Sequence, residues 1–432
     1  MLTAASQATP RPRAVVVVAG SELVRGERTD LNGPYLAREA LSLGLEPARI
    51  AIVGDSPDEL EAALRDCVEA DACLVSGGVG PTHDDRTVEM VAKALGRGLH
   101  VDESLEQQIE AVSRTVAERL RRPYADFQVG VTKQATIPDG AISLGLAGTA
   151  PGLLVEHDGG RVVVVLPGPP GELRRLWPGA LETDAFRGLL ARTHAPGRRV
   201  LRFFGVSESA VARALAEAGG DGGGVEATIC ARDFEIHVDL VVEPGAEARA
   251  DELETALLPP IERWLYSRDE RPIEEHVLAL ARARGLSLAT AESETGGLVA
   301  ARLTSVPGAS GAFAGSVVAY SNELKQSQLG VPPELLAERG AVSAEVAAAM
   351  ARGARERLGV DVAVAVTGIA GPGGGTPEKP VGLVYLHAEG PDGGLAREID
   401  FPGDRASIRA RSAVGALHLV RRLLSGSRDE SV

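Results

Sequence analysis

A serine stands where a predicted strand gives way to a helix, in the segment ATAESETGG (289–297). Side-chain alternation along the strand places Ser293 on one face and the carboxylates of Glu292 and Glu294 on the other. The helix that follows presents its first backbone amides to any negative charge that develops beside the serine. These amides belong to Thr295, Gly296 and Gly297. The segment suits a serine nucleophile with an oxyanion site, although serine and threonine also cap many helices.

A base for this serine is found in the segment VVAYSNELK (317–325), where Tyr320 ends a second predicted strand and Lys325 begins the next turn. A lysine whose amine is desolvated can be neutral near pH 7 and accept a proton from a serine hydroxyl. No GxSxG elbow surrounds the serine, and the eight histidines show no placement typical of a triad. We therefore expect Ser293, Tyr320 and Lys325 to act together.

A glycine-rich segment, VTGIAGPGGGTPEKPVG (366–382), also follows a predicted strand. Its backbone amides could surround a phosphate, and Lys379 or Arg405 could pair with the phosphate charge. The residues expected to form this loop are Thr367, Gly368, Gly371, Gly373, Gly374 and Gly375. It lacks the GK[ST] string of a Walker A loop, and the alternative is a mobile surface loop. A binding loop is favoured because the segment carries little charge.

A second possible binding loop, SGGVGPTHDDRT (76–87), directly follows the apolar strand DACLV. Its glycines, Gly77, Gly78 and Gly80, allow the backbone to approach a phosphate or pyrophosphate, and Thr82 adds a hydroxyl donor. Asp84 and Asp85 supply the hard oxygen ligands that Mg²⁺ or Mn²⁺ prefers. The alternative is a tight turn in which one of the two aspartates caps the next helix. His83 is a weaker candidate, because no second histidine at metal-ligand spacing lies nearby.

Strands and helices alternate around these segments. Continuous β-branched runs and amphipathic stretches follow one another in residues 14–70 and recur at 161–173, a pattern typical of βαβ units with a largely parallel sheet. We expect two three-layer α/β domains, 1–178 and 271–432, joined by a small α+β domain at 179–270. The middle region contains the flexible string GGDGGG, and the charged string SRDERPIEE suits a linker before the last domain.

Composition narrows the functional classes. The 432 residues carry a formal charge of −15 and 3% aromatic residues, so a nucleic-acid surface of basic and stacked aromatic side chains is not expected. Three cysteines without a CxxC spacing support neither a disulfide framework nor a zinc knuckle. The N-terminus has no apolar signal segment, and the longest apolar runs are only strand-sized. A cytoplasmic enzyme without a membrane partner is the expectation.

The first domain resembles the molybdopterin-binding domain of MoaB, MogA and CinA proteins. The resemblance rests on GGVGPTHDDRT, on SELVRGERTDLN (21–32) and on LPGPPGEL (166–173). In CinA proteins it implies a hydrolase that cleaves the pyrophosphate of ADP-ribose with Mg²⁺, Mn²⁺ or Co²⁺. The residues that it implicates as ligand, metal or water-positioning groups are Glu22, Asp30, Asn32, Asp55, Asp84 and Asp85. The main departures are Leu31 and Ala147, and Glu22 could equally be a turn or helix-start carboxylate.

The last domain resembles the C-terminal domain of the CinA family through AESxTGG, VPGAS (306–310), VVAYSNELK, GAVS (340–343) and the glycine-rich segment. The resemblance implies a nicotinamide mononucleotide deamidase that needs no cofactor. Ser293 would be the nucleophile, Lys325 its base and Tyr320 a proton relay or orienting hydroxyl. The family commonly has Cys where this chain has Glu294. If that carboxylate turned inward instead of away from the serine, its charge would favour protonated Lys325 and oppose its use as a base.

The sequence thus predicts a bifunctional pyridine-nucleotide hydrolase, and symmetry favours a homodimer. Two other interpretations remain open at this point. One is a pterin-processing protein, because the fold of the first domain also serves molybdenum-cofactor synthesis. The other is a competence or DNA-repair accessory protein with vestigial sites, for which salt-sensitive DNA binding would be the sign.

Overall fold

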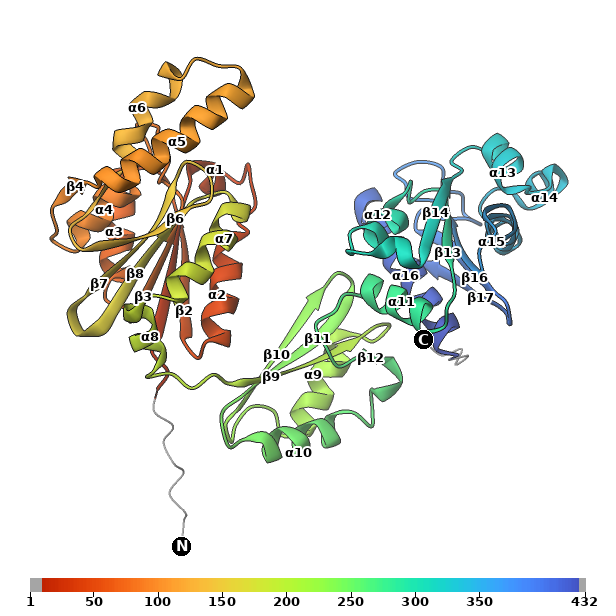
Figure 1. The fold of residues 1–432 in the computed structure, drawn as a ribbon. Helices are drawn as coiled ribbons and strands as arrows, with labels where there is room; N and C mark the ends of the chain where they lie inside the picture. The colour runs from red at the N-terminus through yellow and green to blue at the C-terminus, as the bar shows by residue number, and fades with distance from the viewer. Residues whose placement is uncertain (1–9, 427–432) are drawn as a thin grey trace, which may run out of the picture. The chain divides into compact units, whose positions relative to one another are not determined.

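The computed structural model describes residues 10–426 (Figure 1). The chain divides into two compact units, one up to Gly197 and one from Arg198 onward. Both contain mixed α/β layers, which confirms the predicted fold class. None of the helices between residues 10 and 426 combines the length and the apolarity needed to cross a bilayer.

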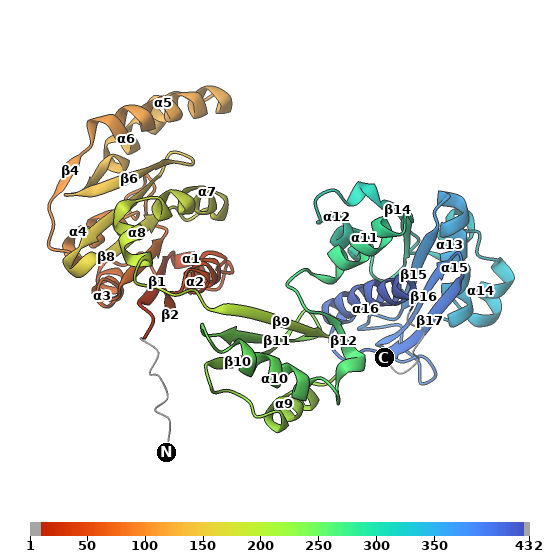
Figure 2. The ribbon, with the colours of Figure 1, turned by 60° about the horizontal axis from the view of Figure 1, so that its bottom comes forward.

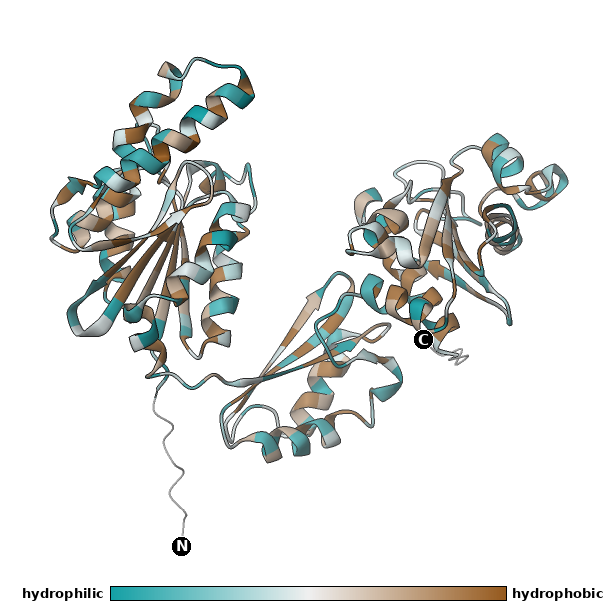
Figure 3. Ribbon diagram, in the orientation of Figure 1, coloured by the Kyte–Doolittle hydropathy of each residue, from teal (hydrophilic) through white to brown (hydrophobic). Residues whose placement is uncertain are grey.

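The first unit is built on a six-stranded sheet of order β2-β1-β3-β8-β7-β6. Its strands are β1 (Arg13–Ala19), β2 (Glu46–Val53), β3 (Ala72–Ser76), β6 (Ala141–Leu146), β7 (Pro151–His157) and β8 (Arg161–Leu166). The pairs from β2 to β8 are parallel, and β7 and β6 add antiparallel neighbours. The hydrophobic strands lie between more polar helices (Figure 3), as a sheet covered on both faces requires.

Helices cover both faces of this sheet. One face carries α2 (Asn32–Ser42), α7 (Pro170–Leu181) and α8 (Asp184–Leu190). The other carries α3 (Pro57–Cys67), α4 (Thr87–Ala94), α5 (Glu103–Leu120) and α6 (Ala125–Gln134). The remaining elements are the short helix α1 (Ser21–Val24) and the ribbon of β4 (Leu99–Val101) with β5 (Thr136–Pro138).

Two expectations for this unit are corrected. The boundary at residue 178 lies inside α7, and the unit continues to Gly197 because Phe186 and Leu189 of α8 are fully buried in its core. The cysteine argument also fails, because Cys67 and Cys73 form a disulfide with a Cα–Cα distance of 5.1 Å. The end of α3 and the start of β3 bring the two buried sulfurs together across a short connection, which cysteine spacing alone did not reveal.

The second unit begins with a small α+β region, as predicted. Its sheet has the order β10-β11-β9-β12 and is covered by two helices. The elements are β9 (Gly197–Phe203), α9 (Glu208–Glu217), β10 (Val225–Arg232), β11 (Glu235–Val242), α10 (Glu247–Leu257) and β12 (Leu265–Ser267). This region and the C-terminal α/β region cluster as one unit rather than as two separate domains. One reason is a buried contact of 2.7 Å between Glu235 of β11 and His418 of the last helix.

The C-terminal region has a five-stranded sheet of order β14-β13-β15-β16-β17. Its strands are β13 (Leu288–Glu292), β14 (Phe313–Val318), β15 (Val362–Gly368), β16 (Leu383–Gly390) and β17 (Gly393–Asp400). The first three neighbours are parallel and the last two are antiparallel.

Helices again cover both faces of the sheet, with α16 on one side and α13 to α15 on the other (Figure 2). The first set is α11 (Ile273–Ala283), α12 (Leu298–Thr304) and α16 (Arg405–Ser425). The second set is α13 (Asn322–Leu329), α14 (Pro333–Arg339) and α15 (Ala344–Leu358). The carboxyl ends of β13 and β14 therefore reach the same edge of the sheet, where each leads into a helix.

Candidate active sites

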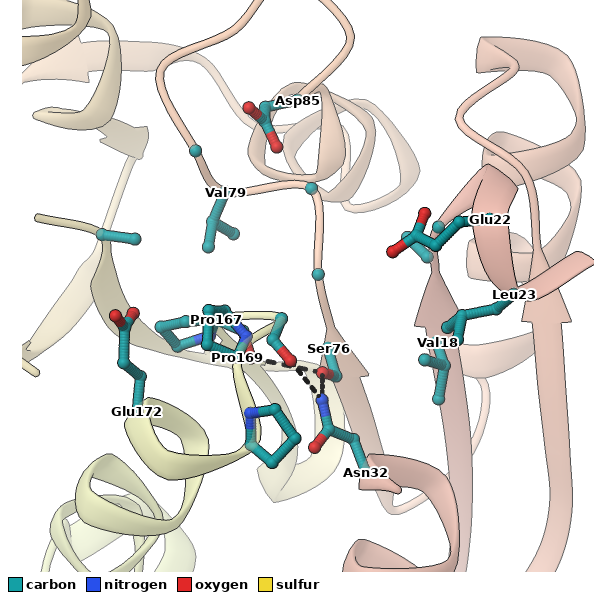
Figure 4. A pocket seen from close by; sticks show the side chains of 18 of the residues that line it. Val18, Glu22, Leu23, Asn32, Ser76, Val79, Asp85, Pro167, Pro169 and Glu172 are labelled. Atoms are coloured by element: carbon teal, nitrogen blue, oxygen red, sulfur yellow. Dashed lines mark hydrogen bonds between the residues drawn. The ribbon is translucent and has the colours of Figure 1, made fainter. Parts of the chain in front are cut away.

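A cavity of about 790 Å³ opens at the carboxyl ends of β1, β3 and β8 in the first unit (Figure 4). From β1 the chain passes to β2 on one side and then returns to β3 on the other. Parallel sheets bind ligands where the strand order reverses in this way. Several residues that the sequence predicted as site residues line the cavity: Glu22, Asn32, Asp55, Gly77, Gly78, Gly80, Asp84 and Asp85. Thr82 is not among the lining residues.

The glycines after β3 are required by close backbone approach. Gly77 has φ +97°, and a Cβ there would lie 2.3 Å from the carbonyl oxygen of Ala19. Gly78 has φ +64°, and its Cβ would lie 2.2 Å from Oγ1 of Thr87. No larger residue fits at either position without moving the wall of the cavity. The loop therefore brings main chain, rather than side chains, to the edge of the cavity.

Asn32 holds two walls of the cavity together. Its Nδ2 donates to Ser76 Oγ at 2.9 Å and to the carbonyl of Gly168 at 2.7 Å. Asp30 accepts from the backbone amides of Asn32 and Gly33, so it fixes the start of α2. Both N–H groups of the Asn32 side chain are therefore used within the protein, and the residue positions these two walls.

The Asp84–Asp85 turn closes on Thr82. Oγ1 of Thr82 contacts the carboxylates of both Asp84 and Asp85, and Asp85 also accepts from the amide of Thr82 at 2.9 Å. The hydrogen bond from Thr82 lowers the pKa of Asp84. The tight turn of the alternative interpretation is therefore present. Neither aspartate caps α4, since no side chain does so. Asp85 still reaches the cavity (Figure 4), so the turn and a ligand-facing carboxylate coexist.

The carboxylates fit a metal only in part. Among residues 10–426, no three or more His, Cys, Asp or Glu side chains are grouped so that they could hold a metal ion. Asp55 is engaged at the start of α1, where its carboxylate accepts from the amide of Ser21 at 2.9 Å. Mg²⁺ commonly takes one or two carboxylates and completes its shell with water and substrate phosphates. Asp84 and Asp85 fit such a shared site.

Glu172 of α7 also lines this cavity and was not predicted as a site residue. It lies opposite Glu22 and Asp85, on a third element (Figure 4). Burial raises its pKa, and the charge of Arg175 only partly opposes this effect. Little in the sequence points to this role, because a glutamate in the first turn of a helix is common for dipole reasons alone.

In the second unit, the structure brings Ser293 and Lys325 together. Nζ of Lys325 lies 2.9 Å from Oγ of Ser293. It also contacts the carbonyl oxygens of Ala319 at 2.9 Å and Tyr320 at 3.4 Å. The lysine side chain is 1% exposed, and this burial lowers its pKa. In the neutral amine, two N–H groups can serve the two carbonyls while the lone pair accepts the serine proton.

Adjacent parallel strands position this pair. Ser293 directly follows β13, and its amide donates to the carbonyl of Val366 in β15 at 3.0 Å. Lys325 lies in α13, which follows β14 and begins with Ser321 accepting from the amide of Leu324. Because β13 pairs with β14, the serine and the first turn of α13 reach the same point.

The predicted oxyanion site is corrected. The amide of Gly296 donates to the carbonyl of Ser293 at 3.1 Å, and that of Gly297 donates to the Glu292 carboxylate at 2.9 Å. Glu292 also accepts from the amides of Val299 and Ala300, so it occupies the helix start that the sequence assigned to the substrate. Thr295 remains the candidate oxyanion donor.

Tyr320 does not contact the dyad with its hydroxyl. Its side chain is 60% exposed, and its hydroxyl accepts from Arg405 Nη2 at 3.0 Å. Nη1 of Arg405 donates to the carbonyl of Gly371 at 2.7 Å. The predicted proton relay is therefore corrected: Tyr320 and Arg405 support the entrance of the glycine-rich loop.

Two other residues of this loop have structural roles. Oγ1 of Thr367 donates to the carbonyl of Ala341 at 2.8 Å, and Nζ of Lys379 donates to the carbonyls of Arg339 and Val342, each at 2.7 Å. Both side chains tie the loop to the segment before α15. Gly373, Gly374 and Gly375 are exposed, so a ligand can reach this part of the predicted phosphate loop.

The carboxylate of Glu294 is buried within the protein. The residue is 4% exposed, and no side chain among the described residues forms a hydrogen bond with its carboxylate. A Cβ on Gly368 would lie 3.1 Å from its Oε1. Burial raises the pKa of Glu294 to about 7, while Lys325 acts in the opposite direction. The Glu294 carboxylate thus lies next to Gly368 at the end of β15, and its charge raises the pKa of Lys325.

Arg409 is a further residue that the sequence did not single out. Its guanidinium donates to the carbonyls of Glu294 and Thr295, each at 2.8 Å, and so fixes the turn after the nucleophile. An arginine within a long C-terminal helix carries no signal of this role before the helix is placed beside β13.

Comparisons with known proteins identify the family to which both parts of the chain are similar. Residues 15–184 match the model of a probable molybdopterin binding domain, and residues 270–424 match the CinA C-terminal domain. A CinA-like protein of Mycolicibacterium gilvum is 45% identical over 424 residues, covering 96% of this chain and 99% of its own. One of Mycobacterium leprae is 44% identical over 423 residues, covering 96% and 97%.

Solved structures match one part of the chain. The competence/damage inducible protein CihA of Agrobacterium tumefaciens is 41% identical, covers 37% of this chain and 99% of its own, and has a TM-score of 0.35. The full-length relatives carry the assignment, because their similarity spans both units in the same order. The chain belongs to the CinA family.

Proposed function

We propose that the C-terminal region hydrolyses the carboxamide of nicotinamide mononucleotide to nicotinate mononucleotide and ammonia. The observation that carries this proposal is the buried contact between Lys325 and Ser293. A lysine that loses its charge through burial can act as a general base without histidine. The substrate itself comes from the family resemblance, since a serine–lysine pair alone fits amides in general.

In this reaction Ser293 Oγ attacks the carboxamide carbon while its proton passes to Nζ of Lys325. Collapse of the tetrahedral species breaks the C–N bond, and the same lysine returns the proton to the departing ammonia. Water then adds to the acyl-serine with Lys325 as base again, which releases the carboxylate and the free serine. Thr295 would donate to the oxyanion, and the backbone amides of the exposed Gly373 and Gly374, with Arg405, would hold the phosphate.

Replacement of the two dyad residues tests this function. We expect Ser293→Ala and Lys325→Met each to lower ammonia release from nicotinamide mononucleotide by at least about 10³-fold, because each removes a covalent or proton-transfer group. The exposed Glu334→Gln is a matched control and retains full activity. Normal deamidation by either dyad variant would refute the assignment, provided that thermal melting shows a folded protein.

We also propose that the first unit hydrolyses the pyrophosphate of ADP-ribose with a divalent metal. Support comes from a cavity that combines main-chain approach at Gly77 and Gly78 with the Asp84–Asp85 turn. A metal such as Mg²⁺ would neutralise phosphate charge there. Asp85→Asn should reduce ADP-ribose cleavage and leave deamidation unchanged. Molybdopterin adenylylation in place of ADP-ribose cleavage would favour the pterin alternative.

A further inference from the structure

Another cavity lies within the second unit, where the small α+β region meets the C-terminal region. Its volume is about 360 Å³, within the range of small-molecule sites. Phe204 and Phe234 line it from the α+β region, and Phe401 lines it from the end of β17. Neither Ser293 nor Lys325 borders it. This cavity is called the junction cavity below.

The polar groups of the junction cavity are cationic or neutral. Arg397, Arg411, Arg422 and His418 line it, and none of the aspartates and glutamates between residues 10 and 426 does so. This is notable in a chain with a net charge of −15. Three aromatic rings and a cluster of guanidinium groups together favour a ligand that has both a flat apolar body and a negative charge.

His418 presents a polar atom that the protein does not satisfy. It is 1% exposed, and its Nε2 lies 2.7 Å from Oε1 of Glu235. Burial lowers the pKa of His418 to about 4, so at neutral pH the ring is uncharged and Nε2 carries the hydrogen donated to the carboxylate. Nδ1 then has a free lone pair and no partner among the described residues. Such a buried acceptor is available to a hydrogen-bond donor in the cavity.

The Glu235 carboxylate is fixed from several sides. It also accepts from the hydroxyl of Tyr266 at 2.5 Å, and His237 lies 3.2 Å away. The Phe204 ring stacks on His418 with ring centres 3.7 Å apart. The histidine ring is thus held rigidly in the wall of the cavity, as a preorganised binding group would be.

Phe234 occupies a backbone position that suits glycine. It lies with Asp233 in the two-residue turn between β10 and β11, at φ +66°. Bulky residues rarely adopt this left-handed conformation, and such strain is found at ligand-binding positions. Its ring packs under the guanidinium of Arg411 at 4.4 Å, and Nε of Arg411 is buried without a partner. The strained residue therefore supplies a wall of the cavity and orients an arginine.

We propose that the junction cavity is a binding site for a small planar aromatic anion. The ring lies among Phe204, Phe234 and Phe401, and the acid group pairs with Arg411. This site is independent of the deamidase and pyrophosphatase proposals, since it shares none of their residues.

A pair of fluorescent probes tests the charge and shape requirements. On the full chain, we expect 8-anilinonaphthalene-1-sulfonate to bind at one site per chain and its uncharged analogue N-phenyl-1-naphthylamine to bind at least tenfold more weakly. Arg411→Gln should weaken binding of the sulfonate at least tenfold, and the exposed Arg352→Gln should leave it unchanged. Benzoate and adenosine monophosphate, added as competitors, distinguish a carboxylate ligand from a nucleotide ligand.

The variant Phe234→Gly tests whether a loss of sulfonate binding could result from misfolding. Glycine accepts the left-handed turn, so the melting temperature should stay the same or rise while binding of the sulfonate is lost. Equal binding of the charged and neutral probes would overturn the proposal. So would undiminished binding of the sulfonate by folded Arg411→Gln or Phe234→Gly protein.

Discussion

Because the carboxylate of Glu294 is buried near Lys325, we expect it to affect the pH dependence of deamidation. Lys325 must be neutral to accept the serine proton, so activity rises with pH as the ammonium loses its proton. A negative charge at Glu294 raises the pKa of Lys325, whereas burial lowers it. Glu294→Gln keeps the shape of the side chain and removes only the charge. The acid limb of kcat/KM should therefore move to lower pH in this variant.

The size of the shift follows from the electrostatics of a buried pair. Two unit charges in contact at about 4 Å interact by about 4 kcal/mol at an effective dielectric constant of about 20. A buried pair without direct contact interacts by about half as much, about 2 kcal/mol. This corresponds to about 1.5 pH units. Since the two groups titrate together, the measured limb belongs to the pair rather than to the lysine alone. Glu294→Cys, which restores the residue common in the family, should give a similar shift.

The assay is ammonia release from nicotinamide mononucleotide between about pH 5 and pH 10, fitted to kcat/KM at each pH. Glu323→Gln, in the exposed first turn of α13, serves as the matched control because it changes the same charge outside the buried pair. A uniform loss of rate with an unmoved acid limb would show that Glu294 acts only in packing. A limb that moves to higher pH would contradict the reasoning outright.

Two further predictions concern stability. Gly353→Ala should lower the free energy of unfolding of the second unit by about 1–3 kcal/mol in urea, because the new Cβ would lie 1.7 Å from the carbonyl oxygen of Leu329. Gly188→Ala is the control, because a Cβ there has open space, and it should be neutral or slightly stabilising. Glu292→Gln should lower the free energy of unfolding by about 1–3 kcal/mol, since the amides of Gly297, Val299 and Ala300 would lose the charge of their acceptor. An unchanged unfolding midpoint would show that this carboxylate does not stabilise the start of α12.

Short segments of the sequence were sufficient to predict much of the candidate site in the C-terminal region. AESETGG and YSNELK each place a reactive group beside the end of a strand, and neighbouring parallel strands must bring such ends together. The glycines at 77 and 78 were also recognisable, because only close backbone approach explains them at the end of a strand. The alternation of strands and helices along the sequence determined the fold class, because such units form a largely parallel sheet with helices on both faces.

Orientation and hydrogen-bond partners were decided by the tertiary structure. Glu294 is buried beside Gly368, where its charge acts on Lys325, and Glu292 takes the amide of Gly297 that seemed free for an oxyanion. The Cys67–Cys73 disulfide depends on how α3 returns to the sheet. A sequence specifies which groups are available along the chain, but the partner of each group depends on which distant segments pack against it. That packing is settled only when the whole sheet and its helices are assembled.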